Sequence, residues 1–429
     1  MIHKFLKLFF ALIIFSIILF VFTHLSQENI SVREEIIICI DPGHGGKPEF
    51  GNRFGGDQWS SENKTFNSFY NYGAELNDFH EHEYVYELGE KVMEELLLLN
   101  TEEGIQKAYK FLSDSGINFL DKKNIIFKPF LSRSESYDKR QDSEEININK
   151  FFRLFDSPVD PREENFDIFP GRLSNINKVK PHLTLSLHIN YVESQKYSGF
   201  HSFFAPSFHE FKYIYDNRND VEKIKKHELF PYWNVSSVSR SIEDWMINDS
   251  RTYFTGFRNT GHFIGRRNTM VTWKYNEMQN FLEKEIDTDL LESNFFEREK
   301  SKYEKWRRSG GHEGIGGDNL YLSQESLRWI SYLFAVNNKI DVNILEPRAS
   351  DFSIAIYNNS ITAGMELGNI YSERDRKFLI ENSDEIARYM AYSMLCILNR
   401  VELSDKNTIN NIIPKTNMLD LKKYGNYFK

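Results

Sequence analysis

The sequence predicts an α/β fold: a single, mostly parallel or mixed sheet flanked by helices and interrupted by large insertions. Three short apolar runs read as buried strands, and they are Ile36–Ile40, Leu183–Leu187 and Ile361–Met365. Between the first two runs, apolar residues recur at three- and four-residue spacing from Glu81 to Leu99, which is typical of an amphipathic helix. Buried strands that are separated by helical segments are the pattern of this fold class.

Composition allows a sizeable core and argues against one class of partner. The chain has 429 residues, of which 40% are hydrophobic, and its formal net charge is −9. A nucleic-acid-binding protein needs an excess of Lys and Arg for phosphate contacts, so we expect no nucleic-acid partner. The chain has two cysteines, Cys39 and Cys396, and both lie within apolar segments. We therefore expect buried thiols rather than a disulfide framework or a metal cluster.

The first 30 residues are typical of an export signal or an uncleaved membrane anchor. Lys4 and Lys7 precede the apolar stretch Leu8–Phe22, and Phe5 and Leu6 extend it toward the length of a spanning helix. The residues after this stretch offer no cleavage site of the Ala-x-Ala kind, which favours anchoring through residues 5–22. Because Lys4 and Lys7 should stay in the cytoplasm, the rest of the chain is expected to be exported.

Each of the three predicted strands is followed at once by a side chain that can bind a metal ion or carry a proton. His44 follows the first strand after Asp41-Pro42-Gly43, His188 follows the second, and Glu366 follows the third. The carboxyl ends of parallel strands share one edge of a sheet, so these residues are expected to converge. Glu81, at the head of the predicted helix, is a further candidate. Two imidazoles and a carboxylate suit a zinc site with one position open, and a second carboxylate can then act as general base.

These residues carry a resemblance to a known family. Asp41-Pro-Gly-His-Gly-Gly46, Ser186-Leu-His-Ile-Asn190 and Met365-Glu-Leu-Gly368 resemble, in this order, the three signature blocks of the zinc-dependent N-acetylmuramoyl-L-alanine amidases of the type 3 family. Leu131-Ser-Arg133 is similar to a strand that ends in Thr-Arg in that family. The segment with Arg172 and Asn177 resembles the helix that precedes the family's second histidine. Together the matching blocks cover about half of the chain.

The resemblance implies a function and a role for each site residue. It implies one zinc ion held by His44, Glu81 and His188, with Glu366 as general base and Asn190 as a substrate-binding residue. The expected reaction is hydrolysis of the amide bond between N-acetylmuramic acid and L-alanine in peptidoglycan. Export fits this partner, because peptidoglycan lies outside the cytoplasmic membrane; the protein is expected to be periplasmic or attached to the outer face of that membrane.

The carboxylate ligand has two competitors, Glu75 and Glu83. In the family's pattern the ligand glutamate precedes apolar helix positions at fixed offsets, and this pattern fits Glu81. Starting from Glu83 would put a charged residue on the apolar face of the helix. The flanking His80 and His82 are expected to be solvated neighbours rather than ligands.

Four other segments complete the predicted order of elements. Asn124–Leu131 is expected to form a strand, and Pro129 within it indicates a sheet edge or an irregularity. The glycine-dense segment Gly310–Gly317 predicts a loop, followed by a helix over Leu320–Val336. Asn382–Glu385 resembles a capping box at the start of the last helix.

The domain organisation expected from these features is one catalytic unit over residues 31–400 with a tail over 401–429. The unit contains insertions at about 47–72, 138–170 and 199–348, where no block aligns with the family. Two other functions remain open from the sequence. One is a zinc peptidase or deacylase that acts on another cell-envelope amide, and the other is an anchored cell-wall-binding protein without activity. A binding protein would have no need of Glu366.

Overall fold

The computed structural model describes residues 33–45, 59–60, 65–66, 72–119, 122–133, 154, 157–158, 168–169, 171–194, 197–204, 217, 220–224, 226, 312–345, 348–349, 354, 358, 360–399 and 401. The predicted N-terminal signal or anchor and nearly all of the tail lie outside these residues. Most of the three predicted insertions does so as well. No helix among the described residues is long and apolar enough to span a membrane.

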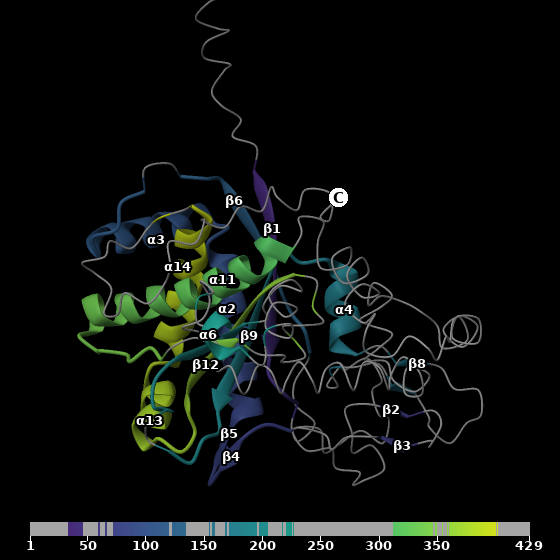
Figure 1. The fold of residues 1–429 in the computed structure, drawn as a ribbon. Helices are drawn as coiled ribbons and strands as arrows, with labels where there is room; N and C mark the ends of the chain where they lie inside the picture. The colour runs from purple at the N-terminus through teal and green to yellow at the C-terminus, as the bar shows by residue number, and fades with distance from the viewer. Residues whose placement is uncertain are drawn as a thin grey trace, which may run out of the picture.

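A six-stranded sheet forms the centre of the protein, in the order β11-β10-β12-β9-β1-β6 (Figure 1). Its strands are β1 (Glu34–Pro42), β6 (Ile125–Leu131), β9 (Leu183–Asn190), β10 (His201–Phe204), β11 (Arg348–Ala349) and β12 (Ile361–Asn369). Neighbouring strands are parallel except β10, which runs antiparallel to β12. The three predicted strands are therefore the adjacent centre of the sheet, and the predicted α/β fold class with a mixed, mostly parallel sheet is confirmed.

The strand predicted over Asn124–Leu131 is β6, at the edge of the sheet, as its proline indicated. Among the residues that the structure describes, β6 pairs with β1 alone, and Pro129 lies opposite Ile38 in the parallel register. Proline lacks the amide hydrogen that a central strand donates to a neighbour, so the free side of β6 tolerates it.

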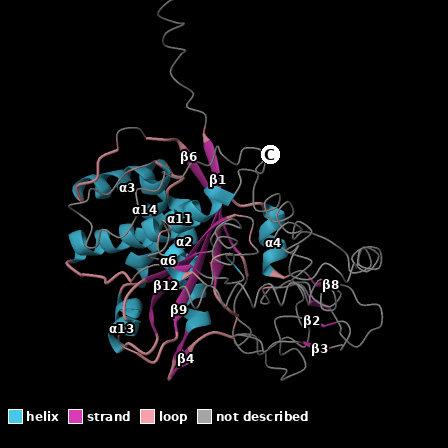
Figure 2. Ribbon diagram, viewed as in Figure 1, coloured by secondary structure: helices cyan, strands magenta, loops and turns pink. Residues whose placement is uncertain are grey.

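Helices pack on both faces of the sheet (Figure 2). The helices are α2 (Glu81–Leu98), α3 (Glu102–Asp114), α4 (Arg172–Val179), α6 (Val221–Ile224), α11 (His312–Leu333), η8 (Phe334–Asn338, a π-helix), α13 (Glu373–Glu381) and α14 (Ser383–Leu398). The described residues also form three two-stranded antiparallel sheets: β2 (Trp59–Ser60) with β3 (Thr65–Phe66), β4 (Glu75–Leu76) with β5 (Phe79–His80), and β7 (Ser157–Pro158) with β8 (Ile168–Phe169). Figures 1 and 2 show α2, α11 and α14 on one side of the sheet and α4 on the other.

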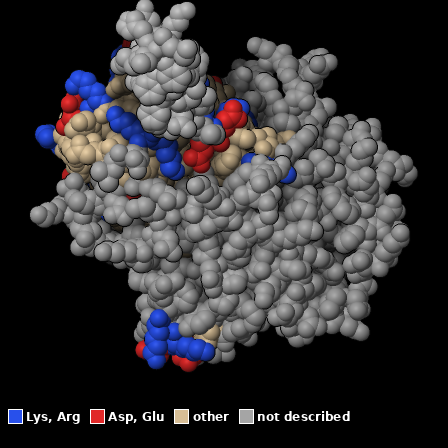
Figure 3. All heavy atoms as spheres, turned by 90° about the horizontal axis from the view of Figure 1, so that it is seen from above, with Lys and Arg blue, Asp and Glu red and all other residues tan. Residues whose placement is uncertain are grey.

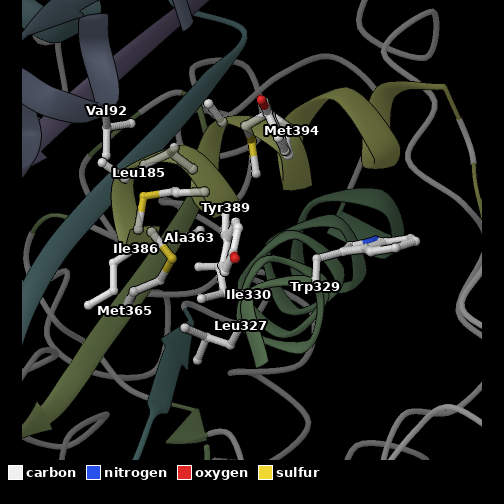
Figure 4. Packing of buried hydrophobic residues seen from close by; sticks show 14 of the residues in the cluster. Val92, Leu185, Leu327, Trp329, Ile330, Ala363, Met365, Ile386, Tyr389 and Met394 are labelled. Carbon is white, nitrogen blue, oxygen red and sulfur yellow. The ribbon is translucent and has the colours of Figure 1, made fainter. Parts of the chain in front are cut away.

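The hydrophobic core lies between the sheet and helices α2, α11 and α14. Leu185 of β9 and Ala363 and Met365 of β12 point toward these helices, and all three side chains are fully buried (Figure 4). Trp329 of α11 and Met394 of α14 are buried in the same core cluster. The predicted apolar face of α2 contributes Val85, Leu88, Val92 and Leu96, each fully buried.

One local prediction was wrong, and a second was correct only for the position of the helix start. α11 begins at His312, so most of the glycine-dense segment that we expected to be a loop is helical. At the start of α14, Asn382 is the N-cap residue but its side chain makes no capping hydrogen bond. It donates instead to the carbonyl of Phe378, at the end of α13. β10 and α11 both lie within the span 199–348 that the sequence marked as an insertion, and both belong to the central unit.

The described surface carries both signs of charge. Figure 3 shows Lys and Arg side chains beside Asp and Glu side chains on one face of the described residues. Several of these charges form exposed ion pairs, such as Lys128 with Glu35 and Lys110 with Asp114.

Candidate metal centre

His44 lies directly after β1 in an uncommon backbone conformation. Its φ is 58°, in the left-handed region that non-glycine residues seldom adopt. The preceding residue, Gly43, donates its amide hydrogen to the carbonyl of Leu187 on β9 at 2.9 Å, which ties the start of this loop to the neighbouring strand. The side chain of His44 is half-buried. Strained residues that are held by their surroundings occur often at functional sites.

Two buried arginines hold the end of β1 through its carbonyl groups. Arg133, just after β6, donates Nε to the carbonyl of Pro42 at 3.0 Å and Nη2 to those of Gly43 and His82 at 3.2 and 2.7 Å. Arg172, in α4, donates Nη1 to the carbonyl of Pro42 at 2.9 Å. The guanidinium groups supply the hydrogen-bond donors that these buried carbonyls need.

Asp41 balances the charge of Arg172. Its carboxylate is 1% exposed, lies 2.8 Å from Nη1 of Arg172, and accepts hydrogen bonds from the hydroxyls of Ser132 and Ser186. Sequence reasoning did not assign this positioning role to Asp41. The available signal was a carboxylate inside an otherwise apolar strand, because such a group must find a partner when it is buried.

Glu81 is the first residue of α2, as predicted, and its carboxylate is buried. One oxygen, Oε2, accepts the amide hydrogen of Ala74 at 2.7 Å. The other, Oε1, accepts that of Ile189 at 2.9 Å, next to His188 on β9. The two backbone donors therefore fix the carboxylate between the β4–β5 hairpin and β9.

His188 reaches the same carboxylate from β9. Its Nδ1 lies 3.2 Å from Oε1 of Glu81, and its ring centroid is 4.9 Å from that of His44, nearly perpendicular to it. The ring packs tightly against two neighbours. A Cβ at Gly43 would lie 2.3 Å from Cε1 of His188, and the Phe203 ring centroid is 5.7 Å from that of His188.

The three side chains fit a single metal ion. Nε2 of His44 lies 3.4 Å from the same Oε1 of Glu81 that Nδ1 of His188 approaches at 3.2 Å, and one ligand atom from each residue lies within 4.8 Å of the others. Tetrahedral zinc with bonds of roughly 2.0–2.1 Å separates its ligand atoms by about 3.4 Å. Two imidazoles and one carboxylate are also the donor types that zinc prefers.

The environment favours the metal-binding forms of these groups. Burial would raise the pKa of Glu81, but the charge of His44 and hydrogen bonds with His188 and His44 outweigh burial and hold this pKa well below its usual value. Burial lowers the pKa of His188, against the opposing effect of Glu81. An ionised carboxylate and a neutral imidazole are the forms that bind metal ions.

Glu366 lies beside this group on the next strand. In the parallel register of β9 and β12 it is the direct partner of His188, so both side chains project from the same face of the sheet. The side chain of Glu366 is half-buried. His201 of β10 is the partner of Glu366 on its other side, and sequence reasoning missed it. The signal is weak, because β10 has only four residues.

Asn190, the predicted substrate-binding residue, is the last residue of β9 and is half-buried. Its carbonyl accepts the amide hydrogen of Ile370 at 2.9 Å. Asn369, at the end of β12, was not predicted to have a role. Its side-chain amide donates to the carbonyls of Val192 and Ser194 at 2.8 and 3.0 Å, and so joins the loop after β9 to β12.

The other candidates near Glu81 form a different arrangement. Glu75 belongs to a second group of possible metal ligands together with His80 and His82, and Glu83 belongs to neither group among the described residues. The prediction that His80 and His82 are solvated was wrong for His82, which is fully buried, while His80 is half-buried. Residue 82 lies in the first turn of α2, beneath the guanidinium of Arg133 that binds its carbonyl.

No protein-family model matches the chain, and no curated protein does. Among solved structures, the chain is similar to the N-acetylmuramoyl-L-alanine amidase from Clostridium difficile 630, with 8% identity and a TM-score of 0.34 over 85% of this chain and 98% of that chain. It is also similar to the N-acetylmuramyl-L-alanine amidase from Mycobacterium smegmatis, with 10% identity and a TM-score of 0.33 over 84% and 94%. A third match, the amidase from Nostoc punctiforme, has 12% identity and a TM-score of 0.30 over 85% and 98%. Similarities this low carry no argument about function, which has to be inferred from the residues of the site.

Proposed function

We propose that this chain is a zinc-dependent hydrolase that cleaves the amide bond between N-acetylmuramic acid and L-alanine in peptidoglycan. One observation carries the proposal. A ring nitrogen of His44 and one of His188 both lie close to the same carboxylate oxygen of Glu81, and Glu366 lies on the adjacent strand. These residues come from segments far apart in the sequence. A protein that only bound cell wall would not need a ligand set and a neighbouring carboxylate on the same sheet face.

Three protein ligands would leave one coordination position of a zinc ion open for water or substrate. His44, Glu81 and His188 would hold one zinc ion through three protein atoms, which is the ligand number of catalytic rather than structural zinc sites. When bound, zinc lowers the pKa of a coordinated water molecule and polarises a carbonyl group. The buried Glu81, fixed by backbone donors from Ala74 and Ile189, keeps both imidazoles oriented toward one point.

Glu366 serves as the general base and then as the acid. Its carboxylate takes a proton from the attacking water and delivers it to the nitrogen of the leaving L-alanine amine. A half-buried carboxylate in register with His188 is near the reacting centre yet is not one of the three grouped ligands. Asn190, two residues beyond His188, lies at the same end of β9 and would contact the substrate.

The substrate assignment comes from the sequence. The blocks around His44, His188 and Glu366 resemble those of amidases that act on peptidoglycan. We propose in addition that residues 5–22 anchor or export the chain, so that the catalytic unit acts in the periplasm or on the outer face of the cytoplasmic membrane.

A comparison of the full-length chain with its Glu366→Gln variant tests this function. We expect the parent to bind zinc and to release stem peptides with amino-terminal alanine from purified peptidoglycan. The variant should keep its zinc and lose activity by about 10²- to 10⁴-fold, because only proton transfer is removed. Glu381→Gln, on the exposed end of α13, is the control and should be fully active.

Two results would contradict the proposal. A parent that binds zinc but releases other cell-envelope fragments would be a zinc peptidase or deacylase. A Glu366→Gln variant as active as the parent would remove the proposed base from the mechanism.

A further inference from the structure

A second group of metal-binding side chains lies outside the candidate centre. Glu75, His80 and His82 come from β4, β5 and the first turn of α2, and one ligand atom from each lies within 4.8 Å of the others. Two of these residues flank Glu81 in the sequence. None of the three takes part in the hydrolysis proposed above.

The hairpin geometry creates this group. β4 and β5 pair antiparallel, with Glu75 directly opposite His80. Residues in direct register project from the same face of a hairpin, and Oε1 of Glu75 lies 3.5 Å from Nδ1 of His80. His82 follows two positions later, and its ring centroid is 5.8 Å from that of His80.

Burial gives the group an inner and an outer side. His82 is fully buried, whereas the side chains of His80 and Glu75 are 34% and 20% exposed. A cation could therefore enter past His80 and Glu75 and meet the buried imidazole behind them. An ion pair between His80 and Glu75 accounts for two members of the group, but it gives no reason for the third to lie within ligand distance of both.

The donor types and spacing match a transition-metal ion. Two imidazole nitrogens and a carboxylate oxygen suit zinc, cobalt or nickel far better than calcium or magnesium, which prefer oxygen. The 3.5 Å between Glu75 and His80 is close to the ligand separation of about 3.4 Å in tetrahedral zinc. It is also close to the 3.2 and 3.4 Å separations in the candidate metal centre.

We propose that Glu75, His80 and His82 bind a second zinc ion, which stabilises the fold beside the candidate metal centre. An ion at this position joins the β4–β5 hairpin to the start of α2 on both sides of Glu81. It thereby fixes the backbone that presents the Glu81 carboxylate to His44 and His188. The inference does not depend on the proposed hydrolase activity.

Zinc binding to the full-length chain tests the second site. The chain is freed of metal with a chelator and titrated with zinc alone, and bound metal is counted by native mass spectrometry and elemental analysis. The parent should bind two ions per chain. The Glu75→Gln/His80→Ala variant should bind one, and the His44→Ala/His188→Ala variant should also bind one. Asp78→Asn, in the exposed turn of the same hairpin, is the control and should bind two.

Stabilisation of the fold by this ion makes a second measurable difference. Ions that bind only the folded state raise its stability, so zinc should raise the thermal midpoint of the His44→Ala/His188→Ala variant through the second site. It should not do so when Glu75→Gln and His80→Ala are added. Circular dichroism of each metal-free variant confirms that it is folded, and His80→Gln replaces His80→Ala if the latter unfolds.

The possible failures are distinguishable. A parent that binds one ion, retained in Glu75→Gln/His80→Ala and lost in His44→Ala/His188→Ala, overturns the second site and leaves the proposed catalytic centre standing. A single ion with the opposite dependence supports the second site and removes the metal from the proposed hydrolase. Two ions in Glu75→Gln/His80→Ala would also overturn the inference.

Discussion

The substitution Gly43→Ala should weaken the metal centre by moving His188. A Cβ at this position would lie 2.3 Å from Cε1 and 2.4 Å from Nδ1 of His188, and 2.8 Å from the carbonyl oxygen of Leu187. Ordinary van der Waals contact begins near 3.4 Å, so one of these groups must move by about 1 Å. The carbonyl oxygen of Leu187 accepts the amide hydrogen of Gly43 and belongs to the central strand β9. We therefore expect the imidazole of His188 to move instead.

The size of the effect follows from the cost of overpacking. Forcing an extra methyl group into a packed site costs about 1–3 kcal/mol. If the His188 ring relieves the overlap by rotating away from Glu81, the ring must rotate back to bind zinc. The same free-energy cost then opposes zinc binding, and the zinc affinity should fall roughly 5- to 150-fold. A displacement of about 1 Å at a reacting centre can cost on the order of 100-fold in rate, so hydrolysis should fall at least as much as zinc affinity.

A competitive zinc titration against a chelator measures this effect, and Gly89→Ala provides a matched control. Gly89 lies in α2, and its added Cβ would meet Pro42, Leu131 and Ile40 side-chain atoms at 3.1–3.3 Å, so it needs shifts of only a few tenths of an ångström. Alanine is also favoured over glycine in a helix by about 1 kcal/mol. Gly89→Ala should therefore leave zinc affinity unchanged.

Parent-like zinc affinity in a folded Gly43→Ala protein would refute this reasoning. In that case His188 would either not bind the metal or have room to move without losing it. An equal loss of affinity in Gly89→Ala would also refute it, because a general loosening of the β1 end would then explain the effect.

Three further predictions concern stability and reactivity. Asp41→Ala should lower the free energy of unfolding by about 3–5 kcal/mol in urea titrations, because the buried guanidinium of Arg172 loses its carboxylate; a loss below about 1 kcal/mol would contradict the pairing. In the metal-free protein, burial holds the pKa of His188 below its ordinary value of 6.5, so the unfolded chain binds more protons below that pH. Stability should be fully present above pH 6.5 and fall as the pH drops toward the folded pKa, and His188→Gln should flatten this part of a urea-midpoint profile. Burial raises the pKa of Cys39 and Cys396 well above the usual value, so alkylation at neutral pH should modify them only after unfolding, as mass spectrometry of native and denatured samples would show.

The sequence was sufficient to predict the central strands and the convergence of their ends, because local apolar patterns and one rule of sheet topology agree there. Short apolar runs indicated the strands before His44 and His188, and the convergence of parallel strand ends then brought these residues together. Glu81 was chosen over Glu75 and Glu83 because the family's pattern, a ligand glutamate ahead of apolar helix positions at fixed offsets, fits Glu81, and α2 does begin at this residue. The structure has the predicted strands and brings His44, Glu81 and His188 together as a possible metal site.

Tertiary packing overrode local preference elsewhere. Three glycines between His312 and Gly317 disfavour a helix by about 3 kcal/mol in total. α11 nevertheless begins at His312, and its later turns bury Leu327, Trp329 and Ile330 fully against the core. Burial of each such side chain contributes about 1.5–3 kcal/mol, so the packed part of the helix outweighs its weak beginning. No local pattern could reveal this balance.

The burial of His82 was hidden for a related reason. Between charged neighbours a histidine is typical of a solvated position, and only the fold shows that the first turn of α2 lies under Arg133. Arg133 follows the edge strand β6, far along the chain from residue 82. Contacts between distant segments of this kind determine burial, and the sequence alone does not give them.

One face of the sheet packs the hydrophobic core, and the other face carries residues of the candidate metal centre. Along β9, Leu185 and Leu187 point toward α2, α11 and α14, whereas Ser186 and His188 point to the other face. The end of β1 is held by Asp41 and Arg172 on that second face, and by Arg133 beside the first turn of α2, through charged hydrogen bonds rather than by apolar packing. Such bonds are directional, so they fix the position of His44 more closely than a hydrophobic contact would. Substitutions in the core should therefore change unfolding before they change the site, while substitutions in the Asp41 network should change both.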